Sequence, residues 1–166
     1  MNKEQPIAYI ICGFIGAGKT TFAKKLEKET GAVRITKDEW MIKIFGNRIT
    51  SDKNFEEYDK KVTKLARDIA FKILESGTDV IIDEGFWARS HREEIKNKVI
   101  ELGARPILYY LEQPIEEMRK RVVTRSETPP EDSFEISEEM FDSYLKHWEP
   151  LGEDEDFILA DLVYGH

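Results

Sequence analysis

A glycine-rich segment that directly follows a short apolar run constrains the fold of this chain more than any other feature. The apolar run covers residues 7–12 ("IAYIIC"), and the segment "GFIGAGKT" covers residues 13–20. The run is short, rich in β-branched side chains and bounded by glycine, which predicts a buried strand. The charged stretch that follows predicts a helix over residues 20–30, ended by Gly31 as its C-terminal cap. We therefore expect a strand, a glycine loop and a helix in direct succession.

The glycine loop fits the pattern G-x-x-x-x-G-K-[ST] at every position from Gly13 to Thr20. Glycines let the backbone turn tightly and bring its amides to phosphate oxygens, and the start of the next helix favours an anion. In this pattern Lys19 reaches the β- and γ-phosphates, and Thr20 offers its hydroxyl to Mg²⁺. The alternative is a glycine turn with a solvated lysine. We predict a nucleotide-phosphate site formed by Gly13, Phe14, Ile15, Gly16, Ala17, Gly18, Lys19, Thr20 and Thr21.

Strand and helix signals alternate along the rest of the chain. Further strands are predicted at residues 32–36, 78–83, 105–112 and 156–165, and further helices at 38–45, 55–76, 88–102, 115–125 and from Ser137 onward. This alternation predicts an α/β fold of the three-layer P-loop NTPase type, with a five-stranded, mostly parallel sheet between helices. The 166 residues are expected to form a single domain. The proline-containing segment 126–137 is expected to form a lid loop.

The first acidic candidate stands at a strand end, where ligands bind in sheets of this kind. Asp38 follows the strand at 32–36 in the sequence "VRITKDEW". A carboxylate there can accept a proton from an attacking hydroxyl or orient it, so we predict that Asp38 is catalytic. The alternative is that Asp38 or Thr36 caps the helix that follows.

The second acidic candidate, Asp83, ends the apolar strand at 78–83. An apolar strand that finishes in aspartate is a usual source of the carboxylate that holds Mg²⁺, so Asp83 is predicted to bind the metal together with Thr20. Glu84 is adjacent and can share this role. The alternative is that Asp83 is a turn residue before Gly85.

Arginines Arg119, Arg121 and Arg125 cluster in "MRKRVVTRSE", near the end of a predicted helix. Arg121 and Arg125 are four residues apart and share one face of that helix. We predict that these two are catalytic and neutralise phosphate charge in the transition state. For all three arginines, the alternative is a solvated basic face near a helix C-terminus.

Further side chains near the strand ends have two open interpretations. The aromatic side chains Trp40, Phe86 and Trp87 line a pocket for a ring-bearing or apolar substrate, or they pack against the sheet edge. Arg89 and Arg92 grip an anionic substrate, or they lie on a solvated face. His91, His147 and His166 lack the spacing of metal ligands, and residues 153–156 ("EDED") are expected to form a solvated acidic loop.

Composition limits the class of partner and compartment. The formal net charge is −8, which disfavours nucleic acid as a partner, and the single cysteine fits a reducing compartment. The N-terminus lacks a charged segment followed by a long apolar one, and apolar runs stay far below the length of a membrane span. We therefore expect a cytoplasmic protein without membrane contact. The cofactors are expected to be ATP and Mg²⁺, since the guanine-binding tetrapeptide N-K-x-D is absent from the sequence.

The segments "GFIGAGKTT", "TKDEW", "VIIDEGFW…HRE" and "MRKRVVTR", in that order, resemble the small P-loop kinases. The nearest group is the AAA-like ATP-binding proteins akin to polynucleotide 5′-kinase, chloramphenicol phosphotransferase and zeta toxin. The resemblance implies a five-stranded parallel sheet, a general base at Asp38 and lid arginines at Arg121 and Arg125. Polynucleotide kinases tend to carry D-x-N after the third strand, whereas this chain has "DEG", which favours a small-molecule acceptor.

The sequence therefore predicts an ATP-dependent, Mg²⁺-dependent kinase that phosphorylates a hydroxyl of a small molecule. One alternative is a polynucleotide 5′-hydroxyl kinase, which is disfavoured but still open. The other is a nucleotide-binding switch that transfers no phosphate to an acceptor.

Overall fold

The computed structural model of the protein describes residues 4–128 and 132–160. Its strands are β1 (Ile7–Gly13), β2 (Val33–Thr36), β3 (Val80–Gly85), β4 (Arg105–Leu111) and β5 (Ile158–Leu159). Its α-helices are α1 (Lys19–Thr30), α2 (Lys37–Phe45), α3 (Phe55–Glu75), α4 (Arg89–Glu101), α5 (Ile115–Glu127) and α6 (Glu138–Leu145). A short 3₁₀ helix, η1 (Ile49–Ser51), was not predicted.

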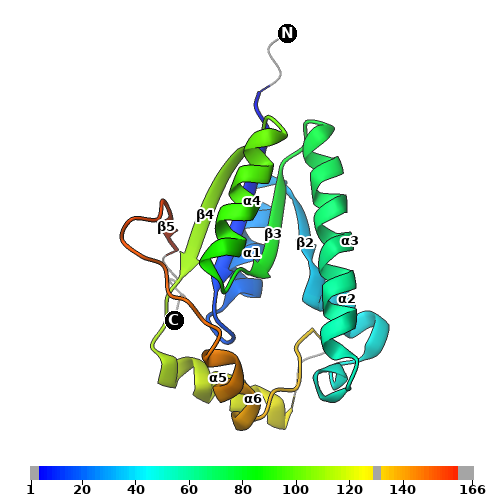
Figure 1. The fold of residues 1–166 in the computed structure, drawn as a ribbon, viewed down its shortest axis with the longest axis vertical. Coiled ribbons are helices and arrows are strands. Elements are labelled where there is room, and N and C mark those ends of the chain that lie inside the picture. The colour runs from blue at the N-terminus through cyan, green and yellow to red at the C-terminus, as the bar shows by residue number, and fades with distance from the viewer. Residues whose placement is uncertain (1–3, 129–131, 161–166) are drawn as a thin grey trace.

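The five strands form one parallel sheet in the order β2-β3-β1-β4-β5, which confirms the predicted α/β fold. Strand β1 lies in the centre of the sheet, hydrogen-bonded to β3 on one side and to β4 on the other. Because all strands run the same way, their carboxyl ends meet at one edge of the sheet (Figure 1). The glycine loop follows β1 at this edge.

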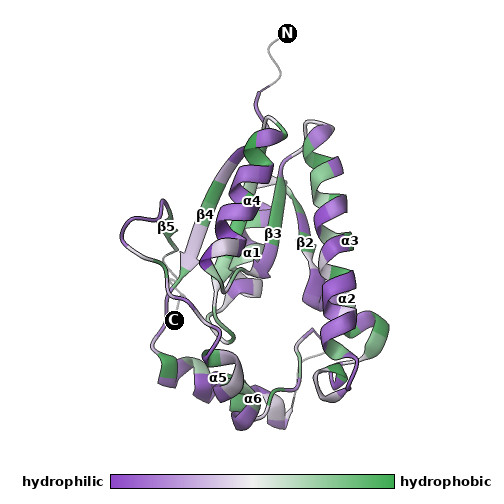
Figure 2. Ribbon diagram, in the orientation of Figure 1, coloured by the Kyte–Doolittle hydropathy of each residue, from purple (hydrophilic) through white to green (hydrophobic). Residues whose placement is uncertain are grey.

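Helices cover both faces of the sheet because the central strands are apolar on both sides (Figure 2). Ala8 and Ile10 of β1 pack in a core with buried residues of α3 and α4. Tyr9 and Ile11 of the same strand pack in the opposite core, with buried residues of α1, α5 and α6. Helices α5 and α6 lie across the carboxyl edge of the sheet, so they face the glycine loop (Figure 1).

Element boundaries differ from the prediction by a few residues, with one larger difference. The structure assigns β5 only to Ile158 and Leu159, although a strand was predicted over 156–165. Residues 161–166 of that prediction lie outside the described part of the chain. Strand β3 extends two residues beyond the predicted end at Asp83, to Gly85. None of the helices in the described ranges is both long and apolar enough to cross a membrane.

Candidate active site

The glycine loop between β1 and α1 has the shape expected of an anion-binding loop. Gly16 and Gly18 adopt φ angles of 83° and 94°, in the left-handed region that favours glycine. A Cβ atom on Gly16 would lie 2.7 Å from the Met118 carbonyl oxygen, so only glycine lets α5 pack this closely on the loop. Within the described ranges, the amides of Ile15, Gly16 and Gly18 donate no hydrogen bond to another protein group. These free amides fit a phosphate group.

The side chains of the loop divide between the core and the site. Phe14 and Ala17 are buried, so these two residues present only backbone atoms to a ligand. Ile15 and Thr20 are half-buried, and Thr21 is exposed on α1. The nine residues predicted to bind phosphate thus lie together at the strand end, and their role in binding stays a prediction.

Lys19 is the first residue of α1, and its Nζ donates a hydrogen bond to the Phe14 carbonyl oxygen at 3.1 Å. Burial lowers the pKa of the Lys19 ammonium, while the carboxylates of Asp83 and Asp38 act in the opposite direction. The same three groups therefore share one electrostatic environment. The predicted phosphate-binding lysine thus lies near both the predicted base and the predicted metal ligand.

Asp83 lies near the end of β3, opposite Ile11 of β1 and Thr36 of β2. Its side chain is buried, and Oδ2 has no hydrogen-bond partner among the described residues. Burial raises the pKa of Asp83 to about 6, with Lys19 opposing this effect and Asp38 adding to it. A buried carboxylate oxygen without a protein partner fits a Mg²⁺ ligand, directly or through water.

The described residues contain no group of three or more acidic, histidine or cysteine side chains arranged as a metal site. Mg²⁺ does not require such a group, because it is usually bound by one or two carboxylates together with waters and substrate phosphates. The neighbouring Glu84 was a second candidate. Its carboxylate instead accepts three hydrogen bonds from Arg67, at 2.5, 2.9 and 3.1 Å.

Asp38 lies in the first turn of α2, with its side chain 45% exposed. The capping alternative does not hold, because the N-cap residue is Thr36 and no side chain forms a capping hydrogen bond. The Thr36 hydroxyl instead accepts a hydrogen bond from Arg34 at 2.7 Å. The carboxylate of Asp38 therefore does not cap α2, and it lines the cleft described below.

Sequence analysis missed two residues next to Asp38. The Lys37 Nζ lies 2.5 Å from Asp59 Oδ1, on α3, and 3.6 Å from Asp38 Oδ1. Burial lowers the pKa of the Lys37 ammonium, but Asp38 and Asp59 outweigh it and leave that pKa raised. Lys37 thus stays charged and holds the first turn of α2 against α3. A contact between residues 22 positions apart leaves no signal in a single sequence.

The three lid arginines occupy different environments on α5. Arg121 Nη1 lies 3.4 Å from the Gly16 carbonyl oxygen, at the loop. Arg125 has a buried Nε without a partner in the described ranges, and burial lowers its pKa while Asp132 opposes the shift. Arg119 points to α6, where it pairs with Asp142 and lies 4.9 Å above the Phe141 ring. Arg121 and Arg125 stay candidates for phosphate contact, whereas Arg119 joins two helices.

The segment before α6 is hydrogen-bonded both to the loop after α2 and to α5. Glu135 N donates to the Asn47 carbonyl at 2.9 Å, and the Glu135 carbonyl accepts from the Thr50 hydroxyl at 2.8 Å. On the other side, the Ser126 hydroxyl and the Ile136 backbone exchange two hydrogen bonds of 2.9 Å. The described part of the predicted lid therefore bridges α5 and the loop after α2. Residues 129–131 of that prediction lie outside the described ranges.

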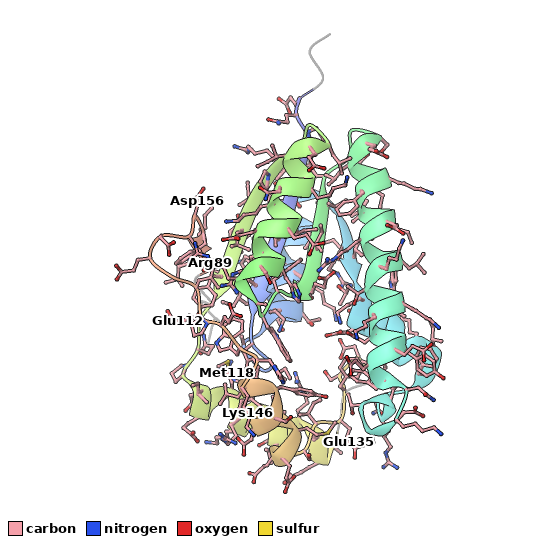
Figure 3. The ribbon with its side chains drawn as sticks, viewed as in Figure 1. Arg89, Glu112, Met118, Glu135, Lys146 and Asp156 are labelled. Carbon is pink, nitrogen blue, oxygen red and sulfur yellow. The ribbon has the colours of Figure 1, made fainter. Side chains whose placement is uncertain are left out.

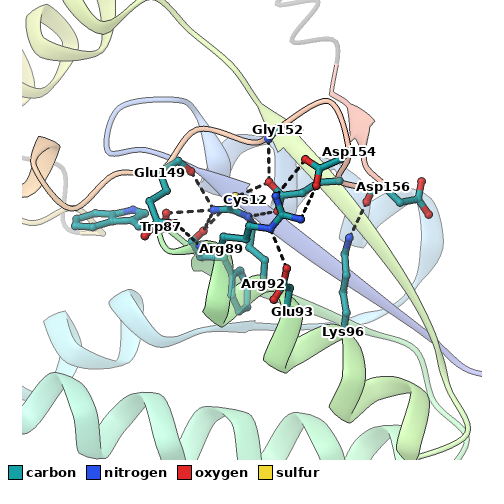
Figure 4. Close-up of polar contacts among 12 residues, drawn as sticks. Cys12, Trp87, Arg89, Arg92, Glu93, Lys96, Glu149, Gly152, Asp154 and Asp156 are labelled. Atoms are coloured by element: carbon teal, nitrogen blue, oxygen red, sulfur yellow. Dashed lines mark hydrogen bonds and ion pairs between the residues drawn. The ribbon is translucent and has the colours of Figure 1, made fainter.

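Arg92 does not grip a substrate, which corrects one of the two interpretations given for it. Its side chain is 1% exposed and donates two hydrogen bonds to Glu155, at 2.7 and 3.0 Å (Figure 4). Its Nη1 also donates to the carbonyl oxygens of Phe86, Trp87 and Glu149. The expectation of a solvated acidic loop is therefore wrong for Glu155, which is buried against Arg92.

Arg89, on the same helix, forms exposed ion pairs with Glu93 and Asp154 (Figure 4). Neither Arg89 nor Arg92 lines the cleft. Arg89 therefore pairs with a residue of α4 and with the C-terminal loop, and Arg92 pairs with that loop. The interpretation that the two arginines grip an anionic substrate is wrong.

The three aromatic residues near the strand ends have separate roles. Phe86 is buried, with a left-handed φ of 49°, and the Arg67 guanidinium lies 5.8 Å from its ring centre. Trp87 is half-buried between Phe14 and Tyr144, at ring distances of 5.1 and 5.6 Å. Trp40 packs between two core clusters and does not line the cleft. Phe86 and Trp87 thus both line the cleft, although Phe86 is also a core residue, and the packing interpretation applies to Trp40.

A cleft of about 970 Å³ opens beside these residues. Its walls come from the glycine loop, the start of α2, most of the length of α3, the turn after β3, the start of α4, the segment 134–136, and the end of α6 with the residues that follow it. Lys19, Lys37, Asp38 and Asp59 all line it. A small molecule in this cleft would therefore lie next to Asp38 and to the loop that fits a phosphate.

Comparison with known proteins agrees with this geometry. The family model described as AAA domain matches residues 9–151 of the chain. The chain belongs to this AAA-domain family. The resemblance to small P-loop kinases is thereby confirmed.

A shikimate kinase from Caldicellulosiruptor bescii is 30% identical over 116 residues, which are 68% of this chain and 62% of that protein. The chain thus spans less than two thirds of this curated relative. A proposed kinase from Chloroflexus aurantiacus has a TM-score of 0.71 at 19% identity, covering 94% of this chain and 88% of that one. A chain of the Pnkp1/Rnl/Hen1 RNA repair complex has a TM-score of 0.69 at 24% identity, covering 86% of this chain and 44% of that one. The two structures share the fold of this chain.

Proposed function

We propose that this protein is a Mg²⁺-dependent kinase that transfers the γ-phosphoryl group of ATP to a hydroxyl of a small molecule. The observation that carries the proposal is the proximity of Lys19 to Asp38 and Asp83, beside a cleft that Lys19 and Asp38 line and that is large enough for an acceptor. Cavities of about 300–1,000 Å³ are typical of small-molecule sites. The similarity to a shikimate kinase supports the same class of acceptor.

The proposed reaction joins the acceptor oxygen to the γ-phosphorus and breaks the bond between that phosphorus and the β,γ-bridging oxygen. ADP leaves with the bridging oxygen, and Asp38 takes the proton of the acceptor hydroxyl. Lys19 and the free loop amides stabilise the phosphate oxygens, and Arg121 and Arg125 add positive charge from α5. Lys37 holds the first turn of α2, so Asp38 is kept at the cleft.

Asp83 and Thr20 are the residues that would hold Mg²⁺ in this proposal. The metal, when bound, neutralises phosphate charge and orients the phosphates for transfer. The buried Oδ2 atom of Asp83 supports this assignment, because a carboxylate oxygen without a partner is costly to bury unless a ligand uses it.

A nucleic-acid 5′-hydroxyl kinase is the second candidate, supported by the fold shared with a chain of an RNA repair complex. The charge of the cleft disfavours it. Six carboxylates and six lysine or arginine side chains line the cleft, whereas a nucleic-acid groove is usually basic. The cleft beside Asp38 also disfavours a nucleotide switch without an acceptor.

Replacing Asp38 by asparagine is expected to lower kcat for phosphoryl transfer by about 10²–10⁴-fold, the usual range for loss of a general base. The KM for ATP should change little, because Asp38 lies on the acceptor side. ADP release with Mg-ATP, measured against a panel of alcohols, tests this. The panel contains sugars, sugar acids, nucleosides, aryl diols and 5′-hydroxyl oligonucleotides. Asp68→Asn, which removes an exposed carboxylate of the same cleft, is the matched control. Undiminished transfer by Asp38→Asn would refute the proposal.

Asp83 gives a pH-dependent prediction whose sign follows from its raised pKa. The folded protein holds this proton up to about pH 6, whereas an unfolded aspartate releases it near pH 3.9. The stability that the protonated carboxyl contributes is therefore present below about pH 4 and is lost as the pH rises to 6. Asp83→Asn stays neutral, so we expect it to exceed the wild type in free energy of unfolding by up to about 3 kcal/mol at pH 8.

The measurement is urea denaturation of the metal-free protein at pH 4.5 and pH 8, with Asp68→Asn as the control. The same Asp83→Asn variant should lose Mg²⁺-dependent transfer. For the wild type, the apparent Mg²⁺ affinity should increase as the pH rises through about 6, because the metal requires the ionised carboxylate. An Asp83→Asn protein that is less stable than the wild type at pH 8 would contradict the prediction that the buried, ionised Asp83 carboxylate destabilises the folded protein.

A further inference from the structure

We propose that the acceptor is an uncharged alcohol that carries an apolar or aromatic ring, and that Phe134 helps to select it. The inference deepens the kinase proposal and rests on it. It differs from what similarity alone suggests, because a shikimate kinase acts, by its name, on shikimate, which is a carboxylate. Three features of the cleft carry the inference: its aromatic walls, the fixed position of Phe134, and the pairing of its charges.

Two pairs of aromatic side chains line the cleft. Trp87, in the turn after β3, lies 5.6 Å from Tyr144 of α6. Phe55, at the start of α3, lies 5.9 Å from Phe134 in an edge-to-face arrangement. All four rings are half-buried and line the cleft, so part of each ring surface faces it. Exposed aromatic faces that converge on one cleft favour stacking with a ring.

Phe134 is held in place by the segment that carries it. Glu135, the next residue, is bonded through its backbone to Asn47 and Thr50, and Ile136 is bonded to Ser126. Figure 3 shows Glu135 on this segment, apart from Lys146, which follows α6. A ring that is fixed in this way contributes to binding with little loss of conformational freedom. Phe134 therefore forms a wall of the cleft that is ready before an acceptor binds.

The charged side chains of the cleft are largely committed to one another. Lys37 pairs with Asp59, and Arg67 with Glu84, in partly buried contacts. Lys60 and Lys64 pair with Glu56 and Asp68 on the exposed face of α3. Lys19 is required by the ATP phosphates in the proposed reaction. An anionic acceptor would thus find few cations to neutralise it.

Lys146 is the exception and offers a way to test the inference. This exposed lysine follows α6, lines the cleft, and makes no ion pair with any residue in 4–128 or 132–160 (Figure 3). A carboxylate or phosphate on the acceptor would be expected to use Lys146. An acceptor KM that depends on Phe134 therefore indicates a neutral, ring-bearing acceptor, whereas an acceptor KM that depends on Lys146 indicates an anionic one.

The first experiment measures binding without chemistry. The full chain, with Mg²⁺ and a non-hydrolysable ATP analogue, is titrated with uridine, adenosine and chloramphenicol as neutral ring-bearing alcohols. Glucose, gluconate, shikimate and a 5′-hydroxyl oligothymidylate form the comparison set, and isothermal calorimetry reports each Kd. We expect at least one ring-bearing alcohol to bind at least tenfold more tightly than every member of the comparison set. Tighter binding of gluconate, shikimate or the oligonucleotide would overturn the inference, as would binding too weak to detect for all three ring-bearing probes.

The second experiment assigns the selectivity to Phe134. Phe134→Ala is expected to raise the KM of the preferred acceptor by about tenfold, the loss of one stacked ring, with kcat nearly unchanged. Phe134→Leu keeps an apolar side chain and so controls for a folding defect. Its KM for the acceptor should lie between those of the wild type and Phe134→Ala. Phe45→Ala removes an exposed ring that stacks on Tyr58 outside the cleft and should leave the KM within about twofold. A larger effect of Lys146→Ala than of Phe134→Ala on the acceptor KM would contradict the inference.

The two experiments separate failure of the inference from failure of the kinase proposal. Binding of a ring-bearing alcohol that weakens in Phe134→Ala, with no phosphoryl transfer to it, would refute the kinase proposal, and the cleft would then be a site for a ring-bearing ligand rather than for an acceptor. Transfer to an anionic acceptor that depends on Asp38 would support the kinase and refute the acceptor class.

Discussion

Replacing Lys19 by methionine is expected to reduce kcat for phosphoryl transfer by about 10²–10³-fold or more while the protein stays folded. Lys19 is the only residue of the glycine loop that brings a full positive charge to the phosphates. Its Nζ lies 3.1 Å from the Phe14 carbonyl oxygen of the same loop, and in the proposed reaction it stabilises the charge on the transferred group. Methionine fills similar space without the charge, so the loss should be in catalysis.

The stability of Lys19→Met should match or exceed that of the wild type, because burial lowers the pKa of Lys19 and so disfavours its charged form in the folded protein. Lys24→Met is the matched control, since Lys24 lies on the same helix in an exposed pair with Asp132. Thermal denaturation and ADP release on the same samples separate the two effects. A Lys19→Met variant that retains transfer within threefold of the wild type would remove the glycine loop from the mechanism.

Much of the fold was predictable because its signals are local and periodic. The order of strands and helices follows from short segments of the sequence. The same is true of the glycine that ends α1 and of the proline that precedes α5. A parallel sheet then brings Lys19, Asp38 and Asp83 to one edge, because each follows or ends a strand. Backbone topology alone therefore places the three candidate residues together. Their roles remain predictions of chemistry.

The remaining features depend on contacts between distant residues. Lys37 and Asp59 lie on different helices, and Glu135 joins the loop at Asn47 across 88 positions of chain. Arg92 reads in the sequence as one more charged residue on an amphipathic helix. Its burial is decided by Glu155, which lies 63 residues away in a segment of four consecutive acids. Single-sequence patterns carry no information about such pairs.

Replacing Arg92 by methionine is expected to lower the free energy of unfolding by about 3–5 kcal/mol, the usual cost of leaving one partner of a buried ion pair alone. The Glu155 carboxylate would be buried without its cation, and three backbone carbonyls would each lose the hydrogen bond from Arg92. Arg89→Met, on the same helix but in exposed pairs, should cost less than about 1 kcal/mol. Urea denaturation at pH 7 measures both.

The pH dependence of this defect identifies its cause. Burial acts to raise the pKa of Glu155, but hydrogen bonds from Arg92 and from Gly152 outweigh it and leave that pKa lowered. The contribution of the wild-type pair is therefore present above about pH 4.3, the unfolded value, and is lost as the pH falls through the folded value. Without Arg92, burial alone acts on Glu155, so protonation should relieve the variant. The difference in stability between wild type and Arg92→Met should thus shrink between pH 7 and pH 4.

The double variant Arg92→Met/Glu155→Leu completes the argument, because it removes the buried charge as well as its partner. If the cost of Arg92→Met comes from the unpaired carboxylate, the double variant should recover a large part of the lost stability. If the three carbonyl contacts dominate, the double variant should stay as unstable as the single one. In that second case Arg92 mainly stabilises the turn at Phe86 and Trp87 through its hydrogen bonds to their carbonyls. Phe86 has a left-handed backbone conformation, which is costly and requires such contacts. Because Trp87 packs against Phe14 of the glycine loop and lines the cleft, transfer should then fall together with stability.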